Sequence, residues 1–186
     1  MVGLDYSAGC VNFHDVGEWL NVVAQRHVMP RRRLLRGGKL DHVRSASEIE
    51  APGTIVNLRR GPDRKPWLFG ADEIHIPAND GIENYETCNP VVRRWLNRVV
   101  RAIASPEVRL PLMLHCTSGK DRTGVATAAL LSTLSIDREL IVEEYLLSDG
   151  EVRRESIEHA LDGLGDAREY FAEADLAALQ RRFLQE

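Results

Sequence analysis

Residues 112–125, LMLHCTSGKDRTGV, join an apolar segment to a polar loop that opens on Cys116. The apolar segment ends LPLMLH, residues 110–115, a short run of large apolar side chains around a proline that is typical of a buried strand. Beyond the loop, residues 123–136 (TGVATAALLSTLSI) are apolar on nearly every face, which predicts a central, buried helix. The stretch therefore predicts a strand, a loop and a helix, with Cys116 where the chain leaves the strand.

Three other short runs predict the neighbours of this strand. Residues 53–58 (GTIVNL) indicate a second buried strand, and residues 73–76 (EIHI) alternate as a more exposed strand does. Residues 33–38 (RLLRGG) indicate a weaker strand that ends in a glycine turn. Between the strands, residues 89–105 predict an amphipathic helix, because an Asn-Pro pair opens it and apolar residues recur at three and four.

Helices without further strands are predicted from Asp137 onward. The first covers residues 138–147, with Asp137 as its cap. The second covers residues 151–161, with Ser148 or Asp149 as its cap and Gly163 or Gly165 at its end. The third covers residues 175–184. Alternating elements followed by helices indicate an α/β fold. We expect a central, mostly parallel sheet of about four or five strands flanked by helices, and a helical C-terminal part.

The chain has 186 residues and a mass of 20.9 kDa, which suits a single domain over 1–186. Residues 1–10 are expected to form an N-terminal extension, and residues 137–186 the helical C-terminal part of the same domain. No apolar run approaches the roughly 18 residues that a membrane span needs, so stable membrane insertion is not expected. The first 19 residues lack the basic and apolar regions of a signal peptide, which favours a cytoplasmic protein.

The formal charge of −4 is unevenly distributed. Residues 137–186 hold 6 basic and 14 acidic side chains, whereas residues 1–136 hold 18 basic and 14 acidic ones. The part with Cys116 is therefore the basic part, which suits an anionic substrate. The basic clusters at 31–33 and 59–65 are predicted as surface charge, and the arginines of the helix at 89–105 as a solvated face rather than a nucleic-acid contact. The sequence leaves the oligomeric state open.

The loop after the predicted strand has the composition of an anion site. A short loop that leads into a helix leaves several backbone N–H groups unpaired, and the helix N-terminus adds a partial positive charge. Consecutive amides of such a loop can surround a tetrahedral oxyanion, with Cys116 at its base. This field, together with Lys120 and Arg122, favours the thiolate of Cys116 over the thiol. The alternative is a structural cysteine in the core, which is common in strands.

The five residues between Cys116 and Arg122 are enough to form a ring of amides. The planar guanidinium of Arg122 can then hold two phosphoryl oxygens at once, and Gly119 allows a tight bend. The Thr123 hydroxyl is placed to stabilise the thiolate. The predicted phosphate-binding residues are Thr117, Ser118, Gly119, Lys120, Asp121, Arg122 and Thr123.

These residues, HCTSGKDRTG, resemble the signature loop of the cysteine-based protein tyrosine phosphatase superfamily, in which His-Cys and Arg-Thr or Arg-Ser are separated by five residues. The Lys-Asp pair is similar to that of bacterial tyrosine phosphatases that also accept phosphoinositides. VNFHDVGEW, RLLRGGKL, IVNLRR and IVEEYLLSD resemble other segments of that branch. The chain departs from the branch at His14, where arginine is common, at Glu18, where glycine is common, and at Asn57, where aspartate is common, and these departures concern the support around the loop.

The resemblance implies phosphate monoester hydrolysis through a cysteinyl-phosphate on Cys116, with no metal and no cofactor. The implied substrates are phosphotyrosine proteins, with phosphoserine, phosphothreonine or phosphoinositides as further possibilities. The leaving oxygen needs a proton from a carboxylic acid. Asp80 follows the third strand, where this superfamily keeps its acid loop, and Asp121 lies within the loop itself. Both remain candidates, and Tyr85 is a candidate for the pocket lining.

Two other classes of protein stay open. A catalytically inactive phosphate-binding module would keep the loop and lack the acid. An arsenate-reductase-like or sulfurtransferase-like enzyme also uses a cysteine in an anion loop, and it needs a resolving cysteine nearby. Cys10 and Cys88 are distant from Cys116 in the sequence, and we expect both to be inert free thiols.

Overall fold

The computed structural model describes residues 4–79, 81 and 83–185. Its centre is a five-stranded sheet in the order β1-β2-β5-β3-β4. The strands are β1 (His14–Asp15), β2 (Leu34–Gly37), β3 (Thr54–Asn57), β4 (Asp72–His75) and β5 (Leu112–His115). Only β1 runs antiparallel to its neighbour, so the predicted, mostly parallel sheet is confirmed. The antiparallel edge strand β1 was not expected from the sequence.

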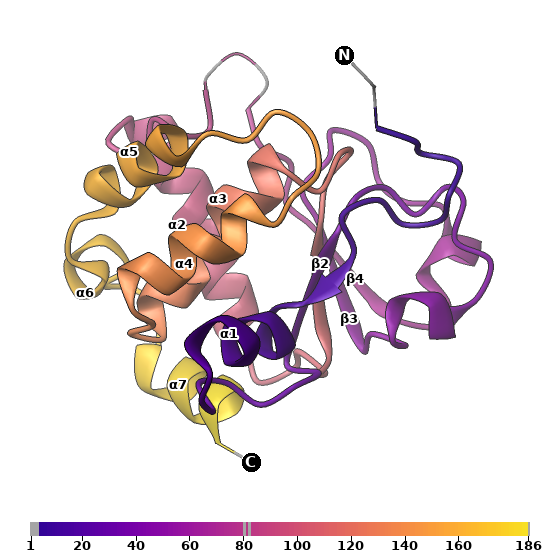
Figure 1. Cartoon of the computed structure of the whole chain (residues 1–186), viewed down its shortest axis with the longest axis horizontal. Coiled ribbons are helices and arrows are strands. Elements are labelled where there is room, and N and C mark those ends of the chain that lie inside the picture. Colours follow the sequence, from indigo (N-terminus) through magenta and orange to yellow (C-terminus); the bar gives the residue numbers. More distant parts are fainter. Residues whose placement is uncertain (1–3, 80, 82, 186) are drawn as a thin grey trace.

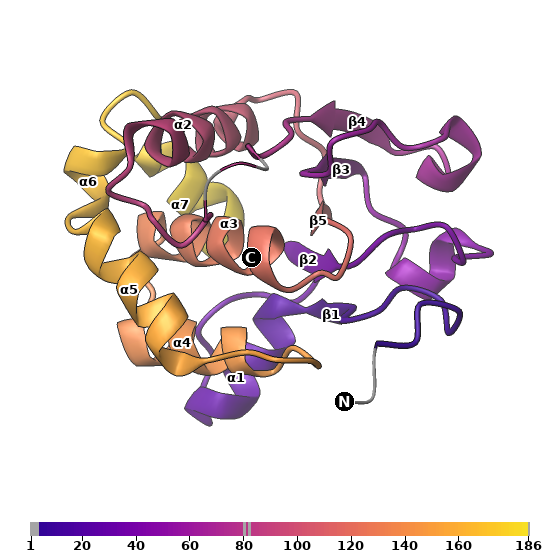
Figure 2. The ribbon, with the colours of Figure 1, turned by 90° about the horizontal axis from the view of Figure 1, so that it is seen from above.

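The α-helices lie on one side of the sheet, and short 3-10 turns lie on the other (Figure 2). The helices are α1 (Val16–Ala24), α2 (Pro90–Ala104), α3 (Asp121–Thr133), α4 (Arg138–Leu146), α5 (Arg154–Leu164), α6 (Ala167–Tyr170) and α7 (Leu176–Leu184). The 3-10 turns are η1 (Ala46–Ile49) and η2 (Lys65–Leu68). Helix α3 is central, with α2, α4 and α5 around it (Figures 1 and 2). This arrangement matches the nearly all-round apolar character of its sequence.

The alternation of side chains along the strands divides the core in two. Leu112 and Leu114 of β5 face the helices and belong to the large core, whereas Met113 faces the other way. Met113 packs there with Leu35 and Ile55 in a smaller core under the 3-10 turns. Because β5 is covered on both faces, the loop that follows it is held between two packed layers.

Helix α3 begins at Asp121, two residues before the predicted start near Thr123. One predicted helix start is wrong. Helix α5 begins only at Arg154, and neither Ser148 nor Asp149 caps it. The Ser148 hydroxyl accepts from Arg36 at 3.0 Å and the Asp149 N–H donates to a side chain near the N-terminus at 2.7 Å, so both residues serve contacts outside the helix.

Other helix ends are as predicted. The side chain of Asp137 caps α4 by accepting from the Glu139 N–H at 2.9 Å, and Gly165 ends α5 with a φ of 56°. Asn89 caps α2 with Pro90 behind it. Among the described residues, no helix is both long and apolar enough to cross a membrane.

Candidate functional site

The site lies at the carboxyl-terminal edge of the parallel strands, where β5 passes into α3. Open α/β sheets bind ligands at this edge. Cys116 directly follows the last residue of β5 and is only 1% exposed. Residues 116–120 form the turn into α3, and we call residues 116–122 the phosphate loop because of the function predicted above. The predicted phosphate-binding residues are therefore continuous in space as well as in sequence.

Backbone carbonyl groups of the phosphate loop point outward and accept hydrogen bonds from neighbouring segments of the chain. Three consecutive carbonyls each accept a hydrogen bond: Thr117 from the Lys39 N–H at 3.0 Å, Ser118 from Asn12 Nδ2 at 2.8 Å, and Gly119 from Arg36 Nη2 at 2.7 Å. The C=O and N–H of a trans peptide point in opposite directions, so the amides of residues 118–120 face the inside of the loop. With the free N–H groups of the first turn of α3, they form a concave set of donors for an anion.

Arg122 closes the loop over this set of donors. Its Nη2 donates to Thr117 Oγ1 at 3.1 Å, which holds the guanidinium across the loop. The Thr123 hydroxyl is fully buried and has no hydrogen-bond partner among the residues that the structure describes. It is therefore free for the role predicted for it beside the thiolate.

Gly119 is required by the approach of a neighbouring strand end. Its φ is 69°, a conformation that side-chain-bearing residues rarely adopt. A Cβ at this position would lie 2.5 Å from the carbonyl carbon of Gly37 and 2.6 Å from the nitrogen of Gly38. The glycine pair at the end of β2, Gly37 and Gly38, therefore lets the phosphate loop pack directly on backbone, whereas the sequence indicated only a turn there.

The ammonium group of Lys120 is held by neighbouring groups and does not lie free in solvent. Its Nζ donates to the Glu151 carbonyl at 2.9 Å and lies 3.7 Å from Asp121 Oδ2, and its side chain is 18% exposed. The contact of Lys120 with substrate stays a prediction. A bound polyanion would have to compete with the Glu151 carbonyl for this ammonium group.

Tyr85 joins the loop after β4 to the phosphate loop. Its hydroxyl donates to Asp121 Oδ1 at 2.8 Å and lies 2.7 Å from the Tyr145 hydroxyl. Burial, followed by the contacts with Tyr145 and Asp121, raises the pKa of Tyr85 far above its ordinary value, so its proton stays in place for the bond to Asp121. Asp80, the other candidate acid, lies outside the described residues, and its role stays a prediction.

A buried salt bridge between β2 and α4, which the sequence did not reveal, supports the phosphate loop. Arg36 of β2 donates from Nη1 to Glu144 of α4 at 2.8 Å, and its Nη2 holds the Gly119 carbonyl. His14 Nε2 lies 2.8 Å from Glu144 Oε1. Burial alone would raise the pKa of Glu144, but Arg36 and His14 outweigh it and hold the pKa below its ordinary value. Arg36 and Glu144 lie in two of the segments that resemble the phosphatase branch, RLLRGGKL and IVEEYLLSD, but the sequence did not show that they form a pair.

A second buried pair holds His115, the residue before the nucleophile. His115 Nε2 lies 2.6 Å from Asp63 Oδ2, and both side chains are 0% exposed. Asp63 belongs to the cluster at 59–65 that the sequence indicated as surface charge, and for this residue the expectation is wrong. Its other oxygen accepts from Arg59 Nη1 at 3.3 Å, so both carboxylate oxygens have a partner.

The departures from the family pattern do not leave the loop unsupported. His14 bonds to Glu144, as described above. Asn57 accepts from the Arg59 N–H at 2.8 Å and donates to Glu73 Oε1 at 3.2 Å, and that oxygen in turn accepts from the Asp63 N–H at 2.9 Å. Glu18, on the surface of α1, pairs with Arg31 at 3.1 Å. Two of the three residues thus take part in holding the site.

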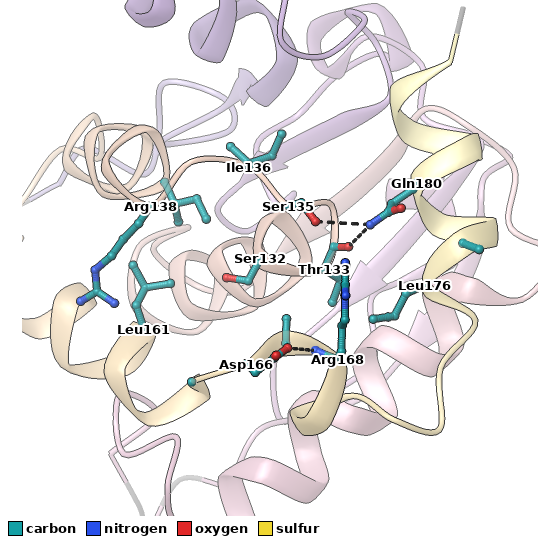
Figure 3. Close-up of a pocket in the computed structure, with 14 residues that line it drawn as sticks. Ser132, Thr133, Ser135, Ile136, Arg138, Leu161, Asp166, Arg168, Leu176 and Gln180 are labelled. Atoms are coloured by element: carbon teal, nitrogen blue, oxygen red, sulfur yellow. Dashed lines mark hydrogen bonds between the residues drawn. The ribbon is translucent and has the colours of Figure 1, made fainter.

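A cavity at the other end of α3 is separate from this site (Figure 3). Its volume is about 500 Å³, and Thr133 and Gln180 are among the residues that line it. Arg138, which also lines it, is already bound to Asp162 at 2.7 Å. The cavity lies roughly 15 Å along α3 from Arg122, at 1.5 Å per helical residue. It is too far away to take part in chemistry at Cys116.

Comparisons with known proteins identify the family to which the chain belongs. The sequence pattern of the tyrosine phosphatase family matches residues 6–185. The triple specificity protein phosphatase PtpB of Mycobacterium tuberculosis is 42% identical over 60 residues, which are 32% of this chain and 21% of PtpB. The matched part is thus about a fifth of the length of that relative.

Solved structures show the same fold. The core catalytic domain of the PP-IP phosphatase SIW14 from S. cerevisiae is similar with a TM-score of 0.58 and 15% identity, over 79% of this chain and 89% of that one. Another structure of the Siw14 catalytic core gives 0.55 and 15%, over 96% and 93%. With a family match over nearly its whole length and a phosphate loop at the edge of an α/β sheet, the chain belongs to the tyrosine phosphatase family.

Proposed function

We propose that this chain hydrolyses phosphotyrosine in proteins and that its range extends to phosphoserine, phosphothreonine or phosphoinositides. The observation that carries the proposal is the phosphate loop, whose outward carbonyls leave its amides facing the Cys116 side. The name of the partial relative, a triple specificity phosphatase, supports a broad range. The Lys-Asp pair of the loop, which resembles that of bacterial tyrosine phosphatases that also accept phosphoinositides, supports it as well.

The reaction has two steps. Cys116 Sγ attacks phosphorus, the bond between phosphorus and the leaving oxygen breaks, and a carboxylic acid, Asp80 or Asp121, protonates that oxygen. Water then attacks the cysteinyl-phosphate, the S–P bond breaks, and inorganic phosphate leaves. The loop amides and Arg122 hold the charge of the equatorial oxygens in both steps. The proposed steps use the thiol, the loop amides, Arg122 and a carboxylic acid, and they call for no metal.

The sulfur-transfer and arsenate-reducing alternatives need a thiol that can attack Cys116. Burial, above all, raises the pKa of the Cys10 thiol to about 12, and its sulfur lies 3.5 Å from the Gly38 carbonyl. A thiol of this kind is a poor nucleophile near neutral pH. Cys88 is exposed and lies beside Gly163 of α5. These surroundings favour phosphate hydrolysis over the alternatives.

The experiment is a comparison of Cys116→Ser with the wild-type chain on a small aryl phosphate, with released phosphate measured. Turnover should fall to the background rate, because a serine hydroxyl is a far weaker nucleophile in this site than a thiolate. Binding of tungstate, a phosphate analogue, should persist in calorimetry because the loop amides are unchanged. Cys88→Ser is the matched control and should keep full activity.

Substantial hydrolysis by Cys116→Ser would exclude the cysteinyl-phosphate mechanism. A wild-type chain that binds tungstate and releases no phosphate would instead be a binding module. The range of substrates is then measured with a panel of phosphotyrosine, phosphoserine and phosphothreonine peptides and phosphoinositides. A chain that acts on the peptides alone would remove phosphoinositides from the proposal.

A further inference from the structure

Helix α2 carries a row of four arginines, and among the residues that the structure describes two of them have partners and two do not. Arg93 lies 4.7 Å from the ring centre of Tyr170, and Arg101 pairs with Glu173 at 2.8 Å. Arg94 and Arg98 are exposed and make no hydrogen bond or ion pair with any residue that the structure describes. Like charges four residues apart destabilise a helix by a few tenths of a kcal/mol. The structure of α2 itself therefore gives no reason for this pair.

A groove runs beside these two arginines. It has a volume of about 440 Å³ and lies between α2 and the segment 77–79 that follows β4. Trp95 and Pro77 contribute apolar surface to it, while Arg94 and Arg98 line it as well. The Trp95 indole N–H donates to the Ile76 carbonyl at 3.1 Å, which fixes α2 against this segment. The groove is thus preformed, with apolar surface and two cations that have no partner in the described part of the chain.

The groove is near the phosphate loop. The Ala78 N–H donates to the Leu58 carbonyl at 3.4 Å, and the Leu58 N–H donates to the His115 carbonyl at 2.9 Å. Ala78 therefore lies two strand spacings from the residue that precedes Cys116, which is roughly 10 Å. About three residues of extended peptide span this distance. A substrate whose phosphate is bound at Cys116 can bring a residue three to five positions away into the groove.

We propose that Arg94 and Arg98 bind an acidic segment of the phosphoprotein substrate, three to five residues from the phosphorylated side chain. The proposal rests on the proposed function and names one feature of its protein substrates. Guanidinium groups pair with carboxylates through two parallel hydrogen bonds, and the apolar surface of the groove can cover the peptide between them.

A protein segment fits this surface better than a lipid membrane does. Membrane-binding basic surfaces contain about four to eight cations on one exposed face. Here two arginines without a partner among the described residues line a groove, and the neighbouring pocket sets Glu169 and Glu173 beside all four arginines of α2.

The test uses phosphotyrosine peptides with two aspartates three and four positions before or after the phosphotyrosine, each paired with the same peptide carrying asparagines. The aspartate peptide of one direction should have the lower KM. The double variant Arg94→Gln, Arg98→Gln should raise this KM roughly three- to tenfold, as two exposed ion pairs would. The effect should shrink as salt rises from about 20 to about 300 mM. The KM of the asparagine peptide should not change.

Two controls separate the proposal from its alternatives. The double variant Arg26→Gln, Arg181→Gln makes the same change in net charge on other exposed surfaces and should leave both peptides unaffected. Hydrolysis of a small aryl phosphate, which does not reach the groove, should be the same in all variants. Failure of the wild-type chain on this aryl phosphate would overturn the proposed function itself.

Other outcomes would overturn the docking proposal alone. One is equal KM values for the aspartate and asparagine peptides in the wild-type chain. Another is a double variant at Arg94 and Arg98 that keeps the preference for aspartate. A third is a double variant that loses binding to vesicles of phosphatidylserine and phosphatidylcholine while its peptide KM values stay unchanged, which would assign the arginines to a membrane.

Discussion

Asp63 and His115 form a buried pair directly beside the nucleophile. The two side chains are 2.6 Å apart and fully buried, so His115 Nε2 has one fixed partner. His115 Nδ1 is also buried and has no hydrogen-bond partner in the described part of the chain. The imidazole is therefore oriented by Asp63 alone among side chains. The Asp63 carboxylate therefore positions His115, the last residue of β5 before Cys116.

We expect Asp63→Asn to lower kcat on a small aryl phosphate by about tenfold or more, because small displacements at a reacting group are costly. The amide also replaces a charged hydrogen-bond partner in a buried site, which should lower the free energy of unfolding by about 1 to 3 kcal/mol. Steady-state kinetics and urea unfolding measure the two effects. Asp41→Asn, which alters the other carboxylate on Arg59, is the control and should keep both values. Unchanged kcat in Asp63→Asn would mean that His115 needs no such partner.

The sequence predicts contacts between residues that are close in the chain better than contacts between residues that are far apart in it. Cys116, Gly119 and Arg122 lie within seven positions, and the offsets of a single loop determine how they can meet. Asp63 is 52 residues from His115, in a cluster of basic residues that is typical of a surface. Only the packing of the loop after β3 against β5 brings this carboxylate inside. No pattern within the cluster distinguishes Asp63 from a solvated aspartate.

Among the elements, the segment between β4 and α2 is connected to the phosphate loop through a side chain. Tyr85 ties it to Asp121, and the Trp95 indole ties it to α2. One oxygen of Asp121 is thus already engaged by a hydroxyl donor. The sequence predicted this segment as the place of the acid and Tyr85 as a pocket residue, and the structure adds that Tyr85 is a bridge between two loops.

We expect Asp80→Asn to remove the alkaline limb of the pH profile of kcat on a phosphate ester with a poor leaving group. The loss of the limb follows because an asparagine has no proton to donate to the leaving oxygen. Asp121→Asn should lower kcat and keep the limb, because its bond with Tyr85 serves the shape of the loop. Tyr85→Phe should resemble Asp121→Asn. If Asp121→Asn removes the limb instead, Asp121 is the acid, and if neither variant does, both assignments are wrong.

The whole molecule joins the phosphate loop to elements far apart in the chain. Arg36 lies 83 residues from Gly119 and 108 from Glu144, and His14 lies 130 residues from Glu144. The strands and their mostly parallel arrangement were predictable because apolar runs and turn residues are local signals, whereas the order of the strands in the sheet was not predicted. The partner of Arg36 was not, because it depends on how α4 packs against β2. A buried arginine without a counter-ion is costly, so the loop and α4 depend on each other.

Glu144→Gln should therefore destabilise the fold by about 3 kcal/mol near pH 7, because it leaves the charge of Arg36 buried and unpaired. The sign of the pH effect follows from the lowered pKa of Glu144. Its contribution is complete above the ordinary glutamate pKa of about 4.3 and is lost as pH falls through the lower value of the folded state. The difference between wild type and variant should thus be largest near neutral pH and shrink below about pH 4. Urea unfolding over this pH range measures it, with Glu143→Gln, a part-exposed neighbour paired with Arg154, as the control. A difference that stays constant down to acid pH would show that Glu144 acts through packing rather than through its charge.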